Sequence, residues 1–317
     1  MAVELSIVIV NWNGGELLRR CLESILQSPP TISCDIIVVD NASTDDSLNW
    51  ARSRAANADF GGLKVYLIEN VENLGFSKAN NQAIAYSSAP LLLLLNNDTE
   101  VRPGAIDLLV ATLASDQRIG ACGPRLVNSD GSLQVSAWRN PPAAWEILIS
   151  GLRLYRLMPR RIRGELLLGR HWSHARRRKV GMVSAAAIMV KREVIDDVGG
   201  FDERFHMYAE DDEWCLRVVR AHWWLVFEPD AVVMHHGGHG ALERWSSLQR
   251  RLTIVEEGLR FQRYCLSRRR LISNLLANSL VVLIAHIWKS LIGDQTNETG
   301  MKLGLYLKHL KRAFWGK

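Results

Sequence analysis

Short apolar runs alternate with helix-like segments over the first hundred residues. Residues 5–10, 35–39, 65–68 and 91–95 are dominated by Val, Ile and Leu, and each run is followed by polar residues. Apolar positions from Leu17 to Ile25 recur at helical spacing, and further helices are expected from about residue 46 and over 77–86. Strands and helices alternating at this pitch predict βαβ units and a parallel sheet.

The fourth run consists of five leucines, Leu91 to Leu95, and ends on Asn96, Asn97 and Asp98. A short run that is apolar throughout predicts a central strand covered on both faces. Ligands of open α/β sheets bind at the carboxyl ends of such strands, so this polar end is a candidate site. The alternative for Asp98 is a helix N-cap.

The pattern changes after residue 120. Short strands are expected over 121–140 with a turn at 128–131, then an irregular basic stretch over 141–180 and an apolar run over 180–190. Helices are expected over 192–198 and 210–221, strands over 223–227 and 231–234, and only helices from 242 onward. We therefore expect one domain over residues 1–240, with a basic flexible segment at about 150–180, and a helical C-terminal region over 241–317.

Composition and charge narrow the class of protein. The 317 residues are 48% hydrophobic and 23% charged, as in ordinary globular proteins, and a net charge of +6 favours an anionic partner. Five scattered cysteines without a C-x-x-C pair indicate reduced thiols in the cytoplasm. The N-terminus lacks a basic region before its apolar run, so it is expected to be a first strand. Nucleic acid is not expected as a partner, because the basic stretch has few stacking aromatics.

Two groups of polar side chains are candidates for a metal site and for a catalytic base. Asp98 offers a carboxylate and His235 an imidazole at two strand ends, a combination that suits Mg²⁺ or Mn²⁺ bound to a polyphosphate. A histidine satisfied inside the core is the alternative for His235. Residues 210–213 place four carboxylates in one helical turn between aromatic flanks, where desolvation would raise a pKa and suit a general base; a solvated helix start is the alternative.

Taken together, these segments resemble the family 2 glycosyltransferases of the GT-A fold, particularly bacterial rhamnosyltransferase-like members. The resemblance spans roughly residues 5–240, in the family's order. The matching motifs are residues 6–14, 38–45, 73–81, 95–98, 199–203, 210–211, 235 and 237–238. It implies a Rossmann-like α/β domain with a mostly parallel central sheet and helices on both faces, followed here by a C-terminal helical extension.

The resemblance also implies residue roles. Asp211 would be the catalytic base with Glu210 beside it, and Asp98 would bind the metal with His235. The remaining implied roles are nucleotide-sugar binding for Asn11, Asn13, Asp40, Asn41, Asn73, Gly75, Asn80, Asn96 and Asn97, and positioning of acceptor or base for Glu213, Arg217, Ala185 and Ala186.

Three features depart from the family's pattern. Asn96 replaces the first acid of the D-x-D motif, so the substrate phosphates would hold much of the metal. Ala185 stands where relatives usually have Gly, which would tighten the acceptor side. His239 and Gly240 follow the glycine pair where Ser is commoner, which alters the expected phosphate contacts.

The activity implied is an inverting, metal-dependent transfer from a nucleotide-diphospho-sugar to a polyprenyl-diphosphate-linked or polysaccharide acceptor in cell-envelope glycan synthesis. The first expectation for the donor is dTDP-L-rhamnose. UDP-GlcNAc or UDP-galactofuranose as donor, and a catalytically silent binding relative, are the alternatives.

The C-terminal region predicts contact with a membrane. Residues 271–292 are apolar, but polar residues near one helical stripe interrupt them: Asn274, Asn278, Ser279, His286, Lys289 and Ser290. This pattern favours an amphipathic helix that lies on a membrane or packs on the domain, and residues 301–317 repeat it. The basic stretch from Arg153 to Lys179 would cover a diphosphate or contact anionic lipid, with a solvated loop as the alternative. Peripheral attachment to the inner face of the cell membrane is therefore expected.

Overall fold

The computed structural model describes residues 3–56, 63–205, 207–237, 246–292 and 298–315. The chain forms two compact units, one of Met1–Trp138 with Ser173–Arg244 and the other of Arg139–Trp172 with Trp245–Lys317. The sequence placed residues 139–172 in the first domain, whereas their contacts group them with the C-terminal helices. Each unit is described by itself below.

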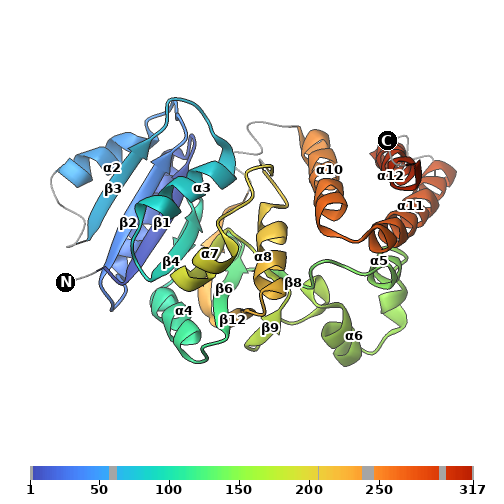
Figure 1. The fold of residues 1–317 in the computed structure, drawn as a ribbon, viewed down its shortest axis with the longest axis horizontal. Helices are drawn as coiled ribbons and strands as arrows, with labels where there is room; N and C mark the ends of the chain where they lie inside the picture. Colours follow the sequence, from blue (N-terminus) through green and yellow to red (C-terminus); the bar gives the residue numbers. More distant parts are fainter. Residues whose placement is uncertain (1–2, 57–62, 206, 238–245, 293–297, 316–317) are drawn as a thin grey trace. The chain divides into compact units, whose positions relative to one another are not determined.

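Four parallel strands build the N-terminal half of the sheet in unit 1, in the order β3-β2-β1-β4 (Figure 1). Their ends differ from the predicted ones by a single residue, because the β-branched and leucine runs that predicted them are the buried parts of the strands. The strands are β1 (Leu5–Asn11), β2 (Cys34–Asp40), β3 (Lys64–Glu69) and β4 (Leu91–Asn96).

The sheet continues beyond β4 with mixed directions. Strand β11 (Ala187–Lys191) is antiparallel to β4, and it is followed by β6 (Ile119–Val127), β12 (Trp224–His235) and β5 (Thr99–Val101). The sequence predicted two strands over 223–234, but β12 is one strand with a register shift between Glu228 and Val232. Short strands complete the set: β7 (Leu133–Gln134), β8 (Ala137–Trp138), β9 (Arg178–Val180) and β10 (Met182–Val183).

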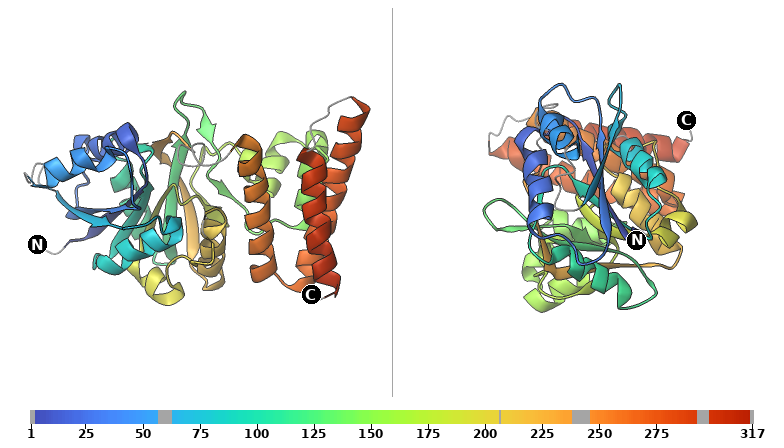
Figure 2. Two further views of the ribbon diagram at one scale, coloured as in Figure 1. Left: turned by 90° about the horizontal axis from the view of Figure 1, so that it is seen from above. Right: turned by 90° about the vertical axis from the view of Figure 1, so that its left-hand side faces the viewer.

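Helices cover both faces of the sheet, as predicted (Figure 2). Leu93 and Leu95 of β4 belong to the cluster that packs with α1 (Gly15–Gln27), α2 (Ser47–Ala56) and α4 (Ala105–Ala114). Leu92 and Leu94 are equally buried and point to the face covered by α3 (Gly75–Tyr86) and α7 (Arg192–Val198). The leucine run is therefore covered on both sides. Helix α8 (Glu210–Arg220) packs near β10 and β12.

Unit 2 is helical throughout its regular structure. The irregular segment predicted over 141–180 is wrong for its first part, which folds into α5 (Ala144–Gly151), η1 (Leu154–Leu157), α6 (Arg160–Leu167) and η2 (Gly169–His171). Glu146 accepts the N–H of Ala143 and so caps α5, a signal that is weak in the sequence because Ala143 has no capping side chain. The C-terminal helices are α10 (Ser247–Cys265), α11 (Arg268–Leu291) and α12 (Glu298–Trp315).

Candidate active site

Three strand ends meet at Asn11, the last residue of β1. The sheet register pairs Asn11 with Asp40 of β2 and Val10 with Asn96 of β4. The buried Asn11 amide donates to Asp40 Oδ1 at 2.8 Å, and its Oδ1 accepts from Asn97 Nδ2 at 2.8 Å. Parallel strands thus bring together residues that lie far apart in the sequence, as the strand-end rule predicts.

The loop after β2 is ordered by the Asp40 carboxylate. Ser43 donates to it through Oγ at 2.6 Å and through its backbone N–H at 2.9 Å. Ser43 Oγ also accepts the N–H of Asn13 at 2.9 Å, which joins this loop to the one after β1. Asn13 and Ala42 both have positive φ, at 47° and 60°, so each loop contains a non-glycine residue in the left-handed region. Asp40 is therefore already engaged in shaping these loops.

Asn41 connects β2 to the start of α3. Its Nδ2 donates to the carbonyl of Gly75 at 3.1 Å, and Asn73 Oδ1 accepts the N–H of Gly75 at 2.9 Å. Gly75 has φ +83°, a conformation that glycine adopts without strain. Asn80 differs from Asn11 and Asn41, because its side chain donates to the carbonyl of Phe76 within its own helix instead of joining two loops.

Asp98 lies in the turn that joins β4 to β5, directly after Asn96 and Asn97. Strand β12 pairs with β5 and places His235 opposite Thr99, so His235 Nε2 lies 3.1 Å from Asp98 Oδ1. Burial alone would raise the pKa of Asp98, but the neighbouring His235 lowers the pKa below its ordinary value. The N-cap alternative for Asp98 does not apply, since Asp98 precedes a strand.

The tautomer of His235 is set by Gln134, a residue that the sequence analysis did not select. Gln134 Nε2 donates to Asn128 Oδ1 at 3.0 Å, which turns its amide oxygen toward His235. His235 Nδ1 lies 2.6 Å from that oxygen and donates its N–H to it, so Nε2 is the ring nitrogen that faces Asp98. Asp98 Oδ1 is buried, and His235 Nε2 at 3.1 Å is the polar atom that the described part of the chain places against it.

Two adjacent electron-rich groups of this kind suit a shared cation. Asp98 and His235 stand as a pair, since the described residues contain no cluster of three or more His, Cys, Asp or Glu side chains placed to hold a metal. The nitrogen of Asn96 Nδ2 lies 3.4 Å from His235 Nε2 and adds no anionic ligand. Gly238 of the glycine pair, and His239 and Gly240 that depart from the family's pattern, lie outside the described residues.

The Asp211 carboxylate lies at the first turn of α8 and is held by backbone amides. Ala185 N–H donates to Oδ2 at 3.3 Å, and Asp212 N–H donates to Oδ1 at 2.9 Å. Desolvation by the surrounding protein nevertheless raises the pKa of Asp211 above its ordinary value. The amides favour the charged form while burial disfavours it, so Asp211 is more basic than an exposed aspartate.

Asp212 forms a carboxyl pair with Asp211. Desolvation and the charge of Asp211 raise the pKa of Asp212 to about 8, although the indole N–H of Trp138 donates to it at 3.4 Å. Two neighbouring carboxyl groups with raised pKa values share a proton near neutral pH. The backbone amides that contact Asp211 favour the charge on that member of the pair.

The backbone before α8 is strained. Tyr208 and Ala209 have φ values of 71° and 67°, although neither is glycine. Consecutive left-handed residues with Cβ atoms cost free energy, and such strain persists where surrounding structure fixes it, commonly at functional sites. This conformation turns the chain into α8 at the residue before Glu210, which is buried.

The turn before β11 joins the two acidic groups of the site. Ala185 N–H reaches Asp211, and the carbonyl of Ala186 accepts the N–H of Asn96 at 2.9 Å. Both predicted alanines thus contribute backbone groups. Asp211 and the strand end that carries Asp98 are held by adjacent residues of one turn.

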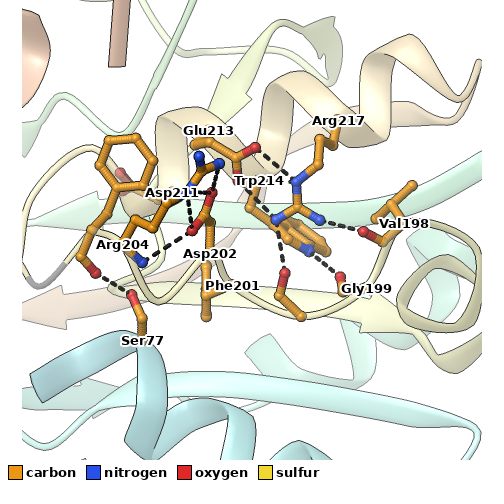
Figure 3. Close-up of polar contacts among 12 residues, drawn as sticks. Ser77, Val198, Gly199, Phe201, Asp202, Arg204, Asp211, Glu213, Trp214 and Arg217 are labelled. Atoms are coloured by element: carbon orange, nitrogen blue, oxygen red, sulfur yellow. Dashed lines mark hydrogen bonds and ion pairs between the residues drawn. The ribbon is translucent and has the colours of Figure 1, made fainter. Parts of the chain in front are cut away.

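Glu213 and Arg217 bind one another instead of the Asp211 carboxylate. Arg217 Nε lies 2.8 Å from Glu213 Oε1, and Arg217 also donates to the carbonyls of Val198 and Gly200 (Figure 3). Trp214 Nε1 donates to Gly199 at 3.0 Å and adds to the same attachment. These contacts fasten the end of α7 to α8.

Comparison with known proteins agrees with this geometry. Residues 6–199 match the family model described as glycosyl transferase family 2. An N-acetylglucosaminyl-diphospho-decaprenol L-rhamnosyltransferase of Mycobacterium tuberculosis is 31% identical over 262 residues, which cover 74% of this chain and 76% of the relative.

Solved structures share the fold at low sequence identity. A mannosyltransferase of Pyrobaculum calidifontis, in complex with GDP-Man and Mn²⁺, aligns over 100% of this chain and 88% of its own, with a TM-score of 0.55 and 16% identity. GalNAc-T7 with UDP, GalNAc and Mn²⁺ covers 74% of this chain and 43% of its own, with a TM-score of 0.56 and 18% identity. The predicted GT-A class, with helices on both faces of the sheet and C-terminal helices, is confirmed.

Proposed function

The chain belongs to the family 2 glycosyltransferases, and we propose that it transfers L-rhamnose from dTDP-L-rhamnose to an N-acetylglucosaminyl-diphospho-polyprenol during cell-envelope glycan synthesis. The observation that carries this proposal is the 31% identity to a mycobacterial L-rhamnosyltransferase over 76% of that protein's length. We place the enzyme in the cytoplasm, peripherally attached to the inner face of the cell membrane, because a polyprenyl-linked acceptor lies in that membrane.

The donor would bind at the ends of β1, β2 and β4. Asp40 and Asn41 would contact the base, with the loop of Asn11 and Asn13 beside them. The network that already fixes these side chains supports this role, since a rigid pocket loses little entropy when the ligand binds. The remaining donor-side residues are Asn73, Gly75, Asn80, Asn96 and Asn97.

Asp98 and His235 would hold a Mg²⁺ or Mn²⁺ ion. The buried Asp98 Oδ1 and His235 Nε2 lie 3.1 Å apart and offer one oxygen and one nitrogen ligand, a combination that fits a divalent cation. When bound, such an ion neutralises charge on the diphosphate of the donor. Because Asn96 supplies no carboxylate, the phosphates would provide most of the other ligands.

Asp211 would act as the general base. The acceptor oxygen bonds to the anomeric carbon while its proton passes to Asp211, and the bond from that carbon to the nucleoside diphosphate breaks with its electron pair. Attack opposite the leaving group inverts the anomeric configuration. The raised pKa of Asp211 supports the role, since a base is effective when its pKa approaches the working pH.

A donor panel tests the sugar and the chemistry separately. We expect dTDP-L-rhamnose with Mn²⁺ to stabilise the protein most, by about 2.7 kcal/mol at a hundred times its dissociation constant. Transfer to a synthetic N-acetylglucosaminyl-diphospho-polyprenol should then add one deoxyhexose, detected by mass spectrometry. A preference for UDP-GlcNAc or UDP-galactofuranose would overturn the assignment of the sugar but keep the class of reaction.

A further inference from the structure

Helix α11 turns its apolar residues outward. It is the one helix in the described part of the chain that is long and apolar enough to cross a membrane. Only 28% of its most apolar 18-residue stretch is buried. Its exposed apolar residues are spaced by three or four positions and so form one stripe, here called the outer stripe. The outer stripe consists of Leu276, Leu280, Leu283, Ile284, Ile287, Trp288 and Leu291.

Two polar residues of α11 make contacts inside unit 2, whereas Ser273, Ser290 and the arginines at the start of the helix are exposed. Asn274 is fully buried and donates to the carbonyl of Pro142 at 3.0 Å. His286 Nδ1 lies 3.0 Å from the hydroxyl of Thr299 on α12. Leu271 and Leu275 of the same helix are buried in the apolar core of unit 2, so the inner side of α11 combines apolar residues with Asn274. The outer stripe is thus a second apolar surface, which the core of unit 2 does not cover.

The outer stripe is too continuous to be incidental. Single exposed apolar residues are common, but contiguous apolar patches mark interaction surfaces. From Leu276 to Leu291 the stripe runs for about 22 Å at 1.5 Å per residue. Trp288 is 64% exposed and Leu291 76% exposed, so their side chains project far beyond the helix.

Residues 153–160 of unit 2 also combine exposed apolar and basic side chains. Arg153, Arg156 and Arg160 are exposed, and Leu157 between them is 85% exposed. Gly151, just before them, packs so closely on Val281 of α11 that a Cβ would lie 2.4 Å from it. This contact places the segment just before η1 beside the middle of α11.

Charge identifies the partner. Unit 2 contains 20 Lys and Arg against 6 Asp and Glu, a formal net charge of +14, whereas unit 1 contains 19 against 27, a net charge of −8. A second copy of so basic a unit would repel the first, and an isolated transmembrane helix would expose Asn274 to lipid. An anionic bilayer matches both the apolar stripe and the charge.

We propose that the outer stripe of α11 inserts into the headgroup and outer acyl region of an anionic bilayer, with the arginines of η1 and α6 on the lipid phosphates. The helix lies along the surface, because its inner face remains packed on α5 and α12. The inference deepens the proposed function by stating how the enzyme reaches a lipid-linked acceptor. It does not depend on the sugar transferred.

Vesicle co-sedimentation of the full chain, without donor or acceptor, tests this proposal. The wild type should bind vesicles of phosphatidylcholine with phosphatidylglycerol and release them at high salt, and bind phosphatidylcholine alone weakly. The triple variant Leu283→Asn, Ile287→Asn and Trp288→Ser should bind at least about tenfold more weakly, since each side chain removes apolar area from insertion. The control variant Leu108→Asn changes a leucine of α4 that is about as exposed as Leu283, and it should bind vesicles as the wild type does.

Two results would overturn the proposal. One is equal vesicle binding by the triple variant at an unchanged melting temperature, which would show that the stripe does not touch lipid. The other is a dimeric wild type and a monomeric triple variant in light scattering, with equal vesicle binding by the two proteins. That result would assign the stripe to contact with a second copy. Stabilisation of the protein by the donor is measured separately and tests the proposed function. Failure of the membrane proposal can therefore be distinguished from failure of the proposed function.

Discussion

The carboxylate of Asp211 accepts a hydrogen bond from the backbone N–H of Ala185 at 3.3 Å. The next residue, Ala186, accepts the N–H of Asn96 through its carbonyl. One turn thus fixes the proposed base relative to the strand end that leads to Asp98. Because both bonds use backbone groups, the alanine side chains can vary without loss of this link.

Replacement of Asp211 by Asn should abolish transfer while leaving donor binding nearly intact. The variant keeps a side chain of the same shape but cannot take a proton, so we expect turnover to fall by about 10²- to 10⁴-fold. Asp212→Asn is the matched control, because the neighbouring carboxyl is already protonated near neutral pH and should retain most turnover. Initial rates and donor titrations of the two variants check this, and unchanged turnover in Asp211→Asn would remove Asp211 from the mechanism.

Asp212→Asn should also change how stability depends on pH. In the folded protein the pKa of Asp212 is raised to about 8, against an ordinary value of 3.8, so the unfolded chain releases this proton first as pH rises. The contribution of the carboxyl to stability is therefore fully present below its unfolded pKa and is lost progressively as pH rises through its folded pKa.

Asn does not titrate, so the advantage of the variant over the wild type should grow from about pH 4 to about pH 8, by at most about 1.4 kcal/mol for each pH unit. Melting temperatures across this range measure it. Asp230→Asn, at an exposed carboxylate, is the control. Parallel curves for Asp212→Asn and wild type would contradict the assignment of the proton to Asp212.

Gln134→Leu should weaken Mn²⁺ binding by about 10- to 100-fold, as is typical when a group that orients a metal-binding histidine is lost. Without the amide oxygen at 2.6 Å, His235 can place its proton on Nε2 and lose the lone pair that faces Asp98. Electron paramagnetic resonance of free Mn²⁺ in the presence of a donor diphosphate measures the affinity. Asn128→Ala, one contact further away, should have a smaller effect, and equal affinities in all three proteins would count against this role of Gln134.

Arg217→Met should destabilise the fold by about 3 kcal/mol, because it leaves the buried Glu213 carboxylate without its bidentate partner. The carbonyls of Val198 and Gly200 lose their donors as well. Urea denaturation measures the loss, with Arg220→Met, an exposed arginine at the end of the same helix, as the control. If Arg217→Met instead kept full stability and lost donor or acceptor affinity, Arg217 would belong to the binding site.

The sequence predicted the strands of the first hundred residues well, because their burial on both faces requires unbroken runs of Val, Ile and Leu. The family resemblance assigned Asn11, Asp40 and Asn96 to one binding site, and the structure places them at neighbouring strand ends. The ordered motifs then identified the family, which the comparison confirmed.

The second half of the chain was harder to predict. The segment over 141–180 lacks the usual capping residues, so its helices were missed, and Gln134 carries no local signal for its contact with His235. Such contacts depend on which strands pair, and pairing between β5 and β12 involves residues more than a hundred positions apart.

Helix α11 shows which of its features follow from the sequence and which depend on the tertiary structure. The sequence alone determined that the helix has one polar and one apolar stripe, because helical periodicity follows from the positions of the side chains. Only the tertiary structure decided which residues face inward: Asn274 is buried beside Leu271 and Leu275, while the outer stripe stays exposed. That choice depends on the partners that the fold supplies, here the carbonyl of Pro142 and the hydroxyl of Thr299, since buried polar groups are retained where hydrogen bonds satisfy them.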